Sequence, residues 1–104
     1  MKKGYLIVRA DVRDAGAYEV YKQLAEQAVR LYGGHYLVRG GALEVLEGSS
    51  PPPGRLVIIE FESVAQARRF YESAEYRKAR ESRADIADMD MHVVEGVSLD
   101  GGNG

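Results

Sequence analysis

The chain is predicted to be an α+β domain in which an antiparallel sheet carries helices on one face. Three observations support this prediction. First, strand-like segments alternate with amphipathic helices along the 104 residues. Second, the segment at residues 55–61 has apolar residues at both odd and even positions, as expected for an interior strand that is covered on both faces. Third, glycines or prolines separate several of these segments. The order is strand, helix, strand, a short extended piece, strand, helix, strand. This is the split βαβ arrangement of ferredoxin-like folds, βαββαβ.

The first half of the chain supplies a strand at residues 5–12 and a long helix over residues 15–32, with Asp14 as its N-cap. Glycine takes the left-handed position after a helix freely, so Gly33-Gly34 should end it. Residues 35–39 form the next strand and residues 43–47 a short extended piece. The buried helix face is predicted from three- and four-residue steps at Ala17, Val20, Tyr21, Leu24, Ala28 and Leu31, widened by Tyr18, Ala25, Val29 and Tyr32.

The second half begins with a stiff loop at residues 49–54, because its three prolines cannot continue a ladder. After the strand at residues 55–61, Ser63 is an N-cap with Gln66 at the capping-box spacing. Ser73 is expected to cap a further helical piece that starts near Glu75. Residues 90–97 form the last strand. We predict one domain over residues 1–97 and a disordered tail over residues 98–104.

Composition excludes several classes of function. The net charge of −2 argues against general nucleic-acid binding, which needs a basic face. There is no cysteine, and the two histidines are not in a spaced metal motif, so no metal or other cofactor is predicted. The N-terminus does not resemble a signal peptide and no apolar run is long enough to span a membrane. We therefore expect a cytoplasmic protein with no nucleic-acid or membrane partner.

Period-two parity divides the strand residues between two faces of the sheet. The helix side carries no formal charge: Leu6, Val8, Ala10, Tyr36, Val38, Val57, Ile59, Phe61, Met91 and Val93. The opposite face is half apolar and half ionisable: Tyr5, Ile7, Arg9, Asp11, His35, Leu37, Arg39, Leu56, Ile58, Glu60, Asp90, His92 and Val94. Such a face predicts a homodimer through the sheet. It is either a subunit interface with internal salt bridges, or an interface that also encloses a ligand pocket.

The motifs resemble one family. They are Tyr32-Gly33-Gly34-x-Tyr36-Leu37-Val38-Arg39-Gly40-Gly41, then Glu44-Val45-Leu46-Glu47-Gly48, then Glu60-Phe61-x-Ser63 with Ala67, and Phe70-Tyr71-x-Ser73-x-Glu75-Tyr76. Over residues 4–97 the chain resembles the bacterial family catalogued as domain of unknown function 1330, within the dimeric α/β-barrel superfamily. The resemblance implies a ferredoxin-like fold whose sheets pair in a homodimeric barrel, and it implies no activity. Superfamily relatives include antibiotic-biosynthesis monooxygenases, haem-degrading enzymes, chlorite dismutase-like proteins and muconolactone isomerase-like enzymes. One departure is Asp14-Ala15-Gly16, where the family commonly has Asp-Pro-Glu.

Three side chains are candidates for proton transfer. His35 and His92 are candidates because an unperturbed imidazole titrates near neutrality, and Glu60 is a candidate because it is an ionisable residue within the most apolar run of its strand. The alternatives are inert strand histidines and a paired carboxylate. No nucleophile motif such as G-x-S-x-G is present.

The predicted ligand-binding group centres on Arg39. Its guanidinium suits bidentate carboxylate recognition, with Gly40 and Gly41 leaving room for the ligand. The alternative is a structural salt bridge to Glu60 or Asp11. Arg9 would line the same pocket, and two of the seven tyrosines, Tyr71 and Tyr76, would line its mouth.

Two functions remain open. The first is a small cofactor-free enzyme, monooxygenase- or isomerase-like, acting on a small anionic or aromatic molecule. The second is a dimeric module that binds a small molecule, or serves structurally, without catalysis.

Overall fold

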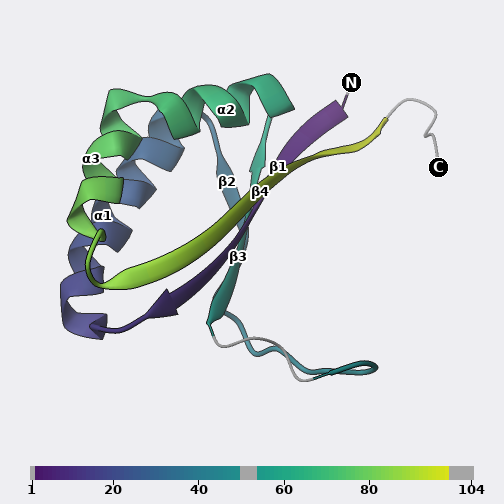
Figure 1. The fold of residues 1–104 in the computed structure, drawn as a ribbon. Coiled ribbons are helices and arrows are strands. Elements are labelled where there is room, and N and C mark those ends of the chain that lie inside the picture. Colours follow the sequence, from purple (N-terminus) through teal and green to yellow (C-terminus); the bar gives the residue numbers. More distant parts are fainter. Residues whose placement is uncertain (1, 50–53, 99–104) are drawn as a thin grey trace.

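Four strands form one antiparallel sheet in the order β2-β3-β1-β4. The computed structural model describes residues 2–49 and 54–98. Along the chain it contains β1 (Lys2–Val12), α1 (Ala15–Leu31), β2 (His35–Arg39), β3 (Arg55–Phe61), α2 (Val64–Glu72), α3 (Ala74–Ser82) and β4 (Ala87–Ser98). Figure 1 shows the three helices on one side of the sheet and the other side bare. The fold is ferredoxin-like, as predicted, with the second helix divided in two.

The predicted helix caps are present. The Asp14 side chain accepts a hydrogen bond from the Ala17 amide at 3.1 Å. At the end of α1, Gly33 has φ +77° and the Gly34 amide donates to the Val29 carbonyl at 2.8 Å, which satisfies the last turn. Sequence spacing therefore located both ends of α1.

The capping box at α2 is half formed. Ser63 Oγ accepts from the Gln66 amide at 3.0 Å, as predicted. The Gln66 side chain does not complete the box, because its Oε1, the acceptor that the box needs, accepts from Arg69 Nη1 at 2.8 Å, while its Nε2 donates to the Tyr32 carbonyl at 2.9 Å. Gln66 thus ties the start of α2 to the end of α1 and positions the two helices relative to each other.

Ser73 divides α2 from α3 and orients both. Its backbone is extended, at φ −69° and ψ 156°, which breaks the helix. Its hydroxyl donates to the Phe70 carbonyl at 2.7 Å and accepts from the Tyr76 amide at 3.0 Å. The predicted cap is confirmed, and it directs Tyr76 into the core.

The core lies between the helices and the sheet and is rich in aromatic rings. Its largest fully buried side chains are Tyr76, Phe61, Phe70 and Val29. In α1 the widened part of the predicted stripe is buried except for the half-buried Tyr32, whereas Val20 and Leu31 were wrongly predicted to be buried and are 56% and 63% exposed. The helix is rotated so that its tyrosines face the sheet, and the buried set is Tyr18, Tyr21, Ala25, Ala28 and Val29.

The connection between β2 and β3 differs from the prediction. Residues 43–47 are not a strand, and Figure 1 shows them extending away from the sheet. Most of the predicted proline loop, at residues 50–53, lies outside the described residues, as does the predicted tail except for Ser98, which ends β4. The pairing of β1 with β4 runs from Lys2 opposite Ser98 to Val12 opposite Ala87, so both strands are longer than predicted.

The predicted division of the two sheet faces is right for β1, β3 and β4 and wrong for the end of β2. The register moves from Tyr36 opposite Ile59 to Val38 opposite Ile58, which marks a β-bulge at Leu37. One extra residue inverts the parity of the remaining strand residues. Val38 therefore lies on the outer face, and Arg39, opposite Val57, lies on the helix side.

Among the described residues, no helix is long and apolar enough to cross a membrane.

Candidate functional site

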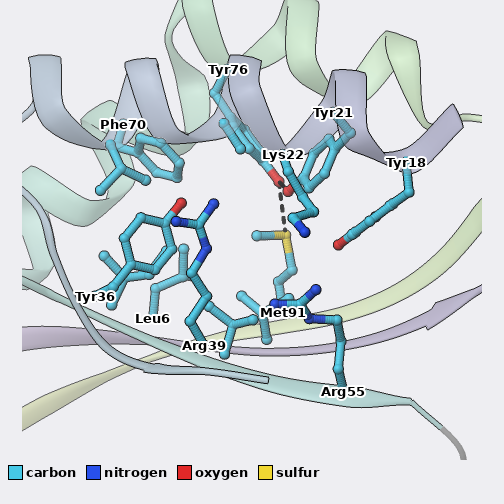
Figure 2. A pocket seen from close by; sticks show the side chains of 15 residues that line it. Leu6, Tyr18, Tyr21, Lys22, Tyr36, Arg39, Arg55, Phe70, Tyr76 and Met91 are labelled. Carbon is cyan, nitrogen blue, oxygen red and sulfur yellow. Dashed lines mark hydrogen bonds between the residues drawn. The ribbon is translucent and has the colours of Figure 1, made fainter. Parts of the chain in front are cut away.

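A small cavity lies between α1 and the helix side of the sheet (Figure 2). Its volume is about 30 Å³, which is room for one or two water molecules. Its lining residues include no carboxylate and no histidine. We call it the tyrosine–arginine cavity, after its polar lining of Tyr18, Tyr21, Tyr36, Tyr76, Arg39, Arg55 and Lys22.

Two tyrosine hydroxyls meet inside the apolar layer. Tyr21 of α1 and Tyr76 of α3 share a buried hydrogen bond of 2.7 Å between their hydroxyls. The Tyr76 hydroxyl also contacts Met91 Sδ of β4 at 3.6 Å, drawn as the dashed line in Figure 2. Because Ser73 fixes the first turn of α3, the position of this hydroxyl is set by a helix cap.

Burial favours the protonated form of three of the cavity tyrosines, Tyr18, Tyr21 and Tyr36. It is the main cause that raises the pKa of Tyr18 and of Tyr36, and it raises the pKa of Tyr21 well above the ordinary value. The neighbouring Tyr76 hydroxyl adds to the effect at Tyr21. All three phenols are therefore neutral hydrogen-bond donors at physiological pH.

Arg39 lies at the rim of the cavity, held from two sides. Its guanidinium donates to Glu26 Oε1 of α1 at 2.5 Å and stacks on the Tyr36 ring, 4.2 Å from the centroid. The hydrogen bond from Arg39 is the main cause that lowers the pKa of Glu26. The predicted partners Glu60 and Asp11 are wrong, because the bulge puts Arg39 on the other side of the sheet from them.

Arg55 is the second arginine of the cavity, and it has no ion pair among residues 2–49 and 54–98. It begins β3 opposite Ala10 on the helix side, and its buried Nε has no hydrogen-bond partner in that part of the chain. Gly40 has φ +72°, and a Cβ there would lie 2.8 Å from an Arg55 terminal nitrogen. Gly40 therefore leaves room for Arg55. A Cβ at Gly41 would meet nothing within 4 Å.

The proposed proton-transfer residues lie on the outer face. His35 of β2 is directly opposite Glu60 of β3, and Tyr5 of β1 donates to Glu60 Oε2 at 3.1 Å. His92 of β4 is opposite Ile7, two strands away from Glu60, hence about 10 Å to the side at ordinary strand spacing.

The sheet separates the predicted residues into two groups. Arg9 shares the outer face with His35, Glu60 and His92, and it lies opposite Asp90. Arg39 lies on the helix side with Tyr76, which is 1% exposed and forms an inner wall of the cavity instead of a mouth. Within one chain these two groups cannot act on the same small molecule. Tyr71 lines a separate groove beside α2, and His92 is also among the residues that line that groove.

Sequence reasoning missed Arg55, Lys22 and the role of the α1 tyrosines. Arg55 shares its parity with Val57 and Ile59, so period-two alternation could have placed it on the helix side. Tyr18 and Tyr21 were interpreted as packing residues, and their spacing contains no signal for a polar cavity. No cluster of three metal-ligating side chains occurs among the described residues.

Comparisons with known proteins agree with this fold. The family model described as domain of unknown function (DUF1330) matches residues 3–97. The chain is similar in structure to a protein of unknown function from Rhodopseudomonas palustris, with a TM-score of 0.73 and 18% identity over 92% of this chain and 83% of the other.

A dimeric protein of unknown function and ferredoxin-like fold from Bacteroides fragilis is also similar. Its TM-score is 0.55, at 11% identity over 89% of this chain and 95% of that one. A search of curated proteins found no match.

Proposed function

Because the chain belongs to the family of domain of unknown function DUF1330, whose description leaves its activity open, we propose a function from the site itself. We propose that the protein binds a small anionic molecule, a carboxylate, phenolate or enolate, in the tyrosine–arginine cavity. The observation that carries the proposal is Arg55, a cation with a buried Nε that has no hydrogen-bond partner among the described residues. Such a donor is costly to bury unless an acceptor satisfies it.

The shape and charge of the cavity define what fits. A volume of about 30 Å³ admits an oxygen-bearing end group and no more, so the body of the ligand would remain outside. Lys22, Arg39 and Arg55 are the cationic residues of the lining. Lys22 pairs with Glu19 at 3.1 Å and Arg39 with Glu26, so Arg55 is the cation of the three with no ion pair among the described residues. The tyrosine hydroxyls are neutral, so they donate hydrogen bonds to the bound oxygen and add no negative charge that would repel it. This favours an anion over a neutral or cationic ligand.

We further propose that two copies pair through their outer sheet faces. In one chain this face exposes apolar side chains such as Ile7 and Ile58 between ionisable ones, and no helix covers it (Figure 1). The similar protein from Bacteroides fragilis is dimeric. In this arrangement Arg9, His35, Glu60 and His92 would lie in the interface.

Catalysis is the second candidate. The buried hydroxyl pair of Tyr21 and Tyr76, at 2.7 Å beside cationic groups, has one hydroxyl hydrogen, now directed at Met91 Sδ, that would be available to a developing oxyanion. A cofactor-free isomerase- or monooxygenase-like reaction passes through an enolate or phenolate. The lining contains no carboxylate or imidazole to remove a proton, so binding is the better supported function.

Calorimetry with benzoate and 4-hydroxybenzoate tests the binding proposal. The wild type should bind at least one of them saturably, and Arg55→Gln should bind about 10- to 100-fold more weakly, the equivalent of one charge-assisted hydrogen bond of about 1.5–3 kcal/mol. Arg77→Gln, an exposed arginine of α3, is the matched control and should bind as the wild type does. Equal binding by Arg55→Gln, or no binding of either anion, contradicts the proposal.

Native mass spectrometry tests the dimer. The proposal expects twice 11.5 kDa for the wild type and a monomer for Ile58→Asp, which places a charge in the sheet face. A monomeric wild type would overturn the interface.

A further inference from the structure

A second, larger hollow lies on the helix side, between α2, α3 and the edge strand β4. Its volume is about 720 Å³, within the usual range for small-molecule pockets of roughly 300–1,000 Å³. We call it the arginine groove. Its floor is apolar, formed by Leu6 of β1 and by Met89, Met91 and Val93 of β4.

The floor is exposed because the helices leave β4 partly uncovered. Val93 is opposite Leu6 and shares its helix-side face, yet Val93 is 39% exposed whereas Leu6 is 4% exposed. An apolar strand residue on a core face is normally covered. The side chains of β4 therefore offer an apolar surface inside a groove of ligand size.

Three arginines from two helices border this floor. Arg68 comes from α2, Arg80 from α3, and Arg83 is the C-cap residue of α3. Arg80 stacks on the Tyr71 ring, 4.5 Å from its centroid, and donates to the Tyr71 hydroxyl at 3.0 Å. That contact fixes the plane of its guanidinium.

Among the described residues, no ion pair neutralises these three arginines. Glu72 is the single carboxylate among the residues that line the groove, and no ion pair joins it to an arginine in the described part of the chain. The Nε atoms of Arg80 and Arg83 are buried and have no hydrogen-bond partner among residues 2–49 and 54–98. The lining of the groove therefore carries three arginines against one carboxylate, an excess of positive charge; one of the three, Arg83, also lies over the Tyr21 ring, 5.6 Å from its centroid.

We propose that the arginine groove is a second binding site, for an amphipathic monocarboxylate with an aliphatic or aromatic body. The body would lie on the methionine and valine floor, and the carboxylate would accept hydrogen bonds from the guanidinium groups, whose fork geometry matches its two oxygens. Leu6 and Met91 line both hollows, and the Tyr76–Met91 contact lies at this boundary. The groove site stands independently of the cavity and of Arg55.

The test is a fluorescence titration of the wild-type protein with 8-anilinonaphthalene-1-sulfonate, followed by displacement with octanoate. We expect one saturable site per chain from which octanoate displaces the probe. Arg68→Glu should weaken octanoate about 10-fold or more, as expected for loss of a charged contact and addition of a repulsive one. Arg68 is exposed, so this variant should fold normally. Arg80→Gln provides a second reading, and Arg77→Gln is the matched control on the same helix.

Two results overturn the proposal. One is octanoate binding that is unchanged in both Arg68→Glu and Arg80→Gln. The other is no octanoate binding by the wild type, the result also expected if a second copy of the chain covers the groove. Arg55→Gln separates the two sites: it should leave octanoate affinity unchanged while it weakens benzoate, so either site can fail without the other.

Discussion

Removal of one hydroxyl from the Tyr21–Tyr76 pair tests whether the contributions of the two hydroxyls to the unfolding free energy depend on each other. Tyr76→Phe keeps the ring, which packs 4.6 Å from the Phe70 centroid and 6.3 Å from that of Tyr21. It removes the oxygen that makes the 2.7 Å bond to Tyr21 and the contact to Met91. The substitution therefore deletes a hydrogen bond in an unchanged packing environment.

Burial of the remaining hydroxyl determines how much unfolding free energy Tyr76→Phe loses. Tyr21 is 7% exposed, so loss of its buried partner should cost about 1–3 kcal/mol; the adjoining cavity has room for a water molecule, which places the expected cost at the lower end of that range. Tyr21→Phe should cost less, because the Tyr76 hydroxyl keeps Met91 Sδ as a weak partner. In the double variant no hydroxyl is left unpaired. Its cost should fall below the sum of the single costs by about 1 kcal/mol, within the usual coupling of contacting residues.

Urea denaturation followed by far-UV circular dichroism measures all four proteins. One fixed protein concentration is needed, because the stability of a dimer depends on concentration. The urea midpoint should fall with an unchanged slope. Single costs that add in the double variant to within about 0.3–0.5 kcal/mol would refute the coupling.

Three further predictions concern the supports of the site. Ser73→Ala should lower the unfolding free energy by about 1–2 kcal/mol in the same urea assay, because it removes the buried hydroxyl that caps α3 and bonds the last turn of α2. Glu26→Gln should increase benzoate affinity in calorimetry with little change in stability, since it frees the Arg39 guanidinium; unchanged or weaker binding would contradict this role. Burial raises the folded-state pKa of Tyr21 above the ordinary value of 10.0, so its contribution to stability is complete below that pH and is lost as pH rises through the folded pKa. Urea midpoints should therefore decline above about pH 10, and less steeply in Tyr21→Phe.

The fold was predictable because local signals and the global pattern agree. Asp14, Ser63 and Ser73 each precede an apolar stripe, and each caps a helix in the structure. Strand boundaries at residues 35–39 and 55–61 were also right, because glycine or proline flanks the segments. These features depend on short-range chemistry, which a single sequence contains.

The site was only partly predictable, and β2 shows why. Parity assigns Arg39 to the outer face, and one bulge at Leu37 moves it to the other side of the sheet. No residue type in segment 35–39 predicts that bulge, since Leu37 is an ordinary strand residue. The pairing of Arg39 with Glu26 and the proximity of Gly40 to Arg55 depend on this long-range register.

Helix rotation was the other unpredictable quantity. The apolar stripe of α1 is wide, so the helix could bury either the side with Val20 and Leu31 or the side with Tyr18 and Tyr21. In the structure the tyrosine side is buried. That choice depends on packing against α3, where Tyr76 offers a hydroxyl to Tyr21. The polar cavity therefore arises from tertiary contacts that the spacing of apolar residues does not encode.

The most direct test of the central proposal is an NMR titration of the wild-type protein with benzoate, observed at the side-chain Nε–H signal of Arg55. This is the buried donor with no partner among the described residues. The proposal predicts a saturable downfield shift of that signal, with no such shift at the exposed Arg77. Benzoate that leaves the Arg55 signal unmoved, while shifting others or none, would contradict anion binding in the tyrosine–arginine cavity.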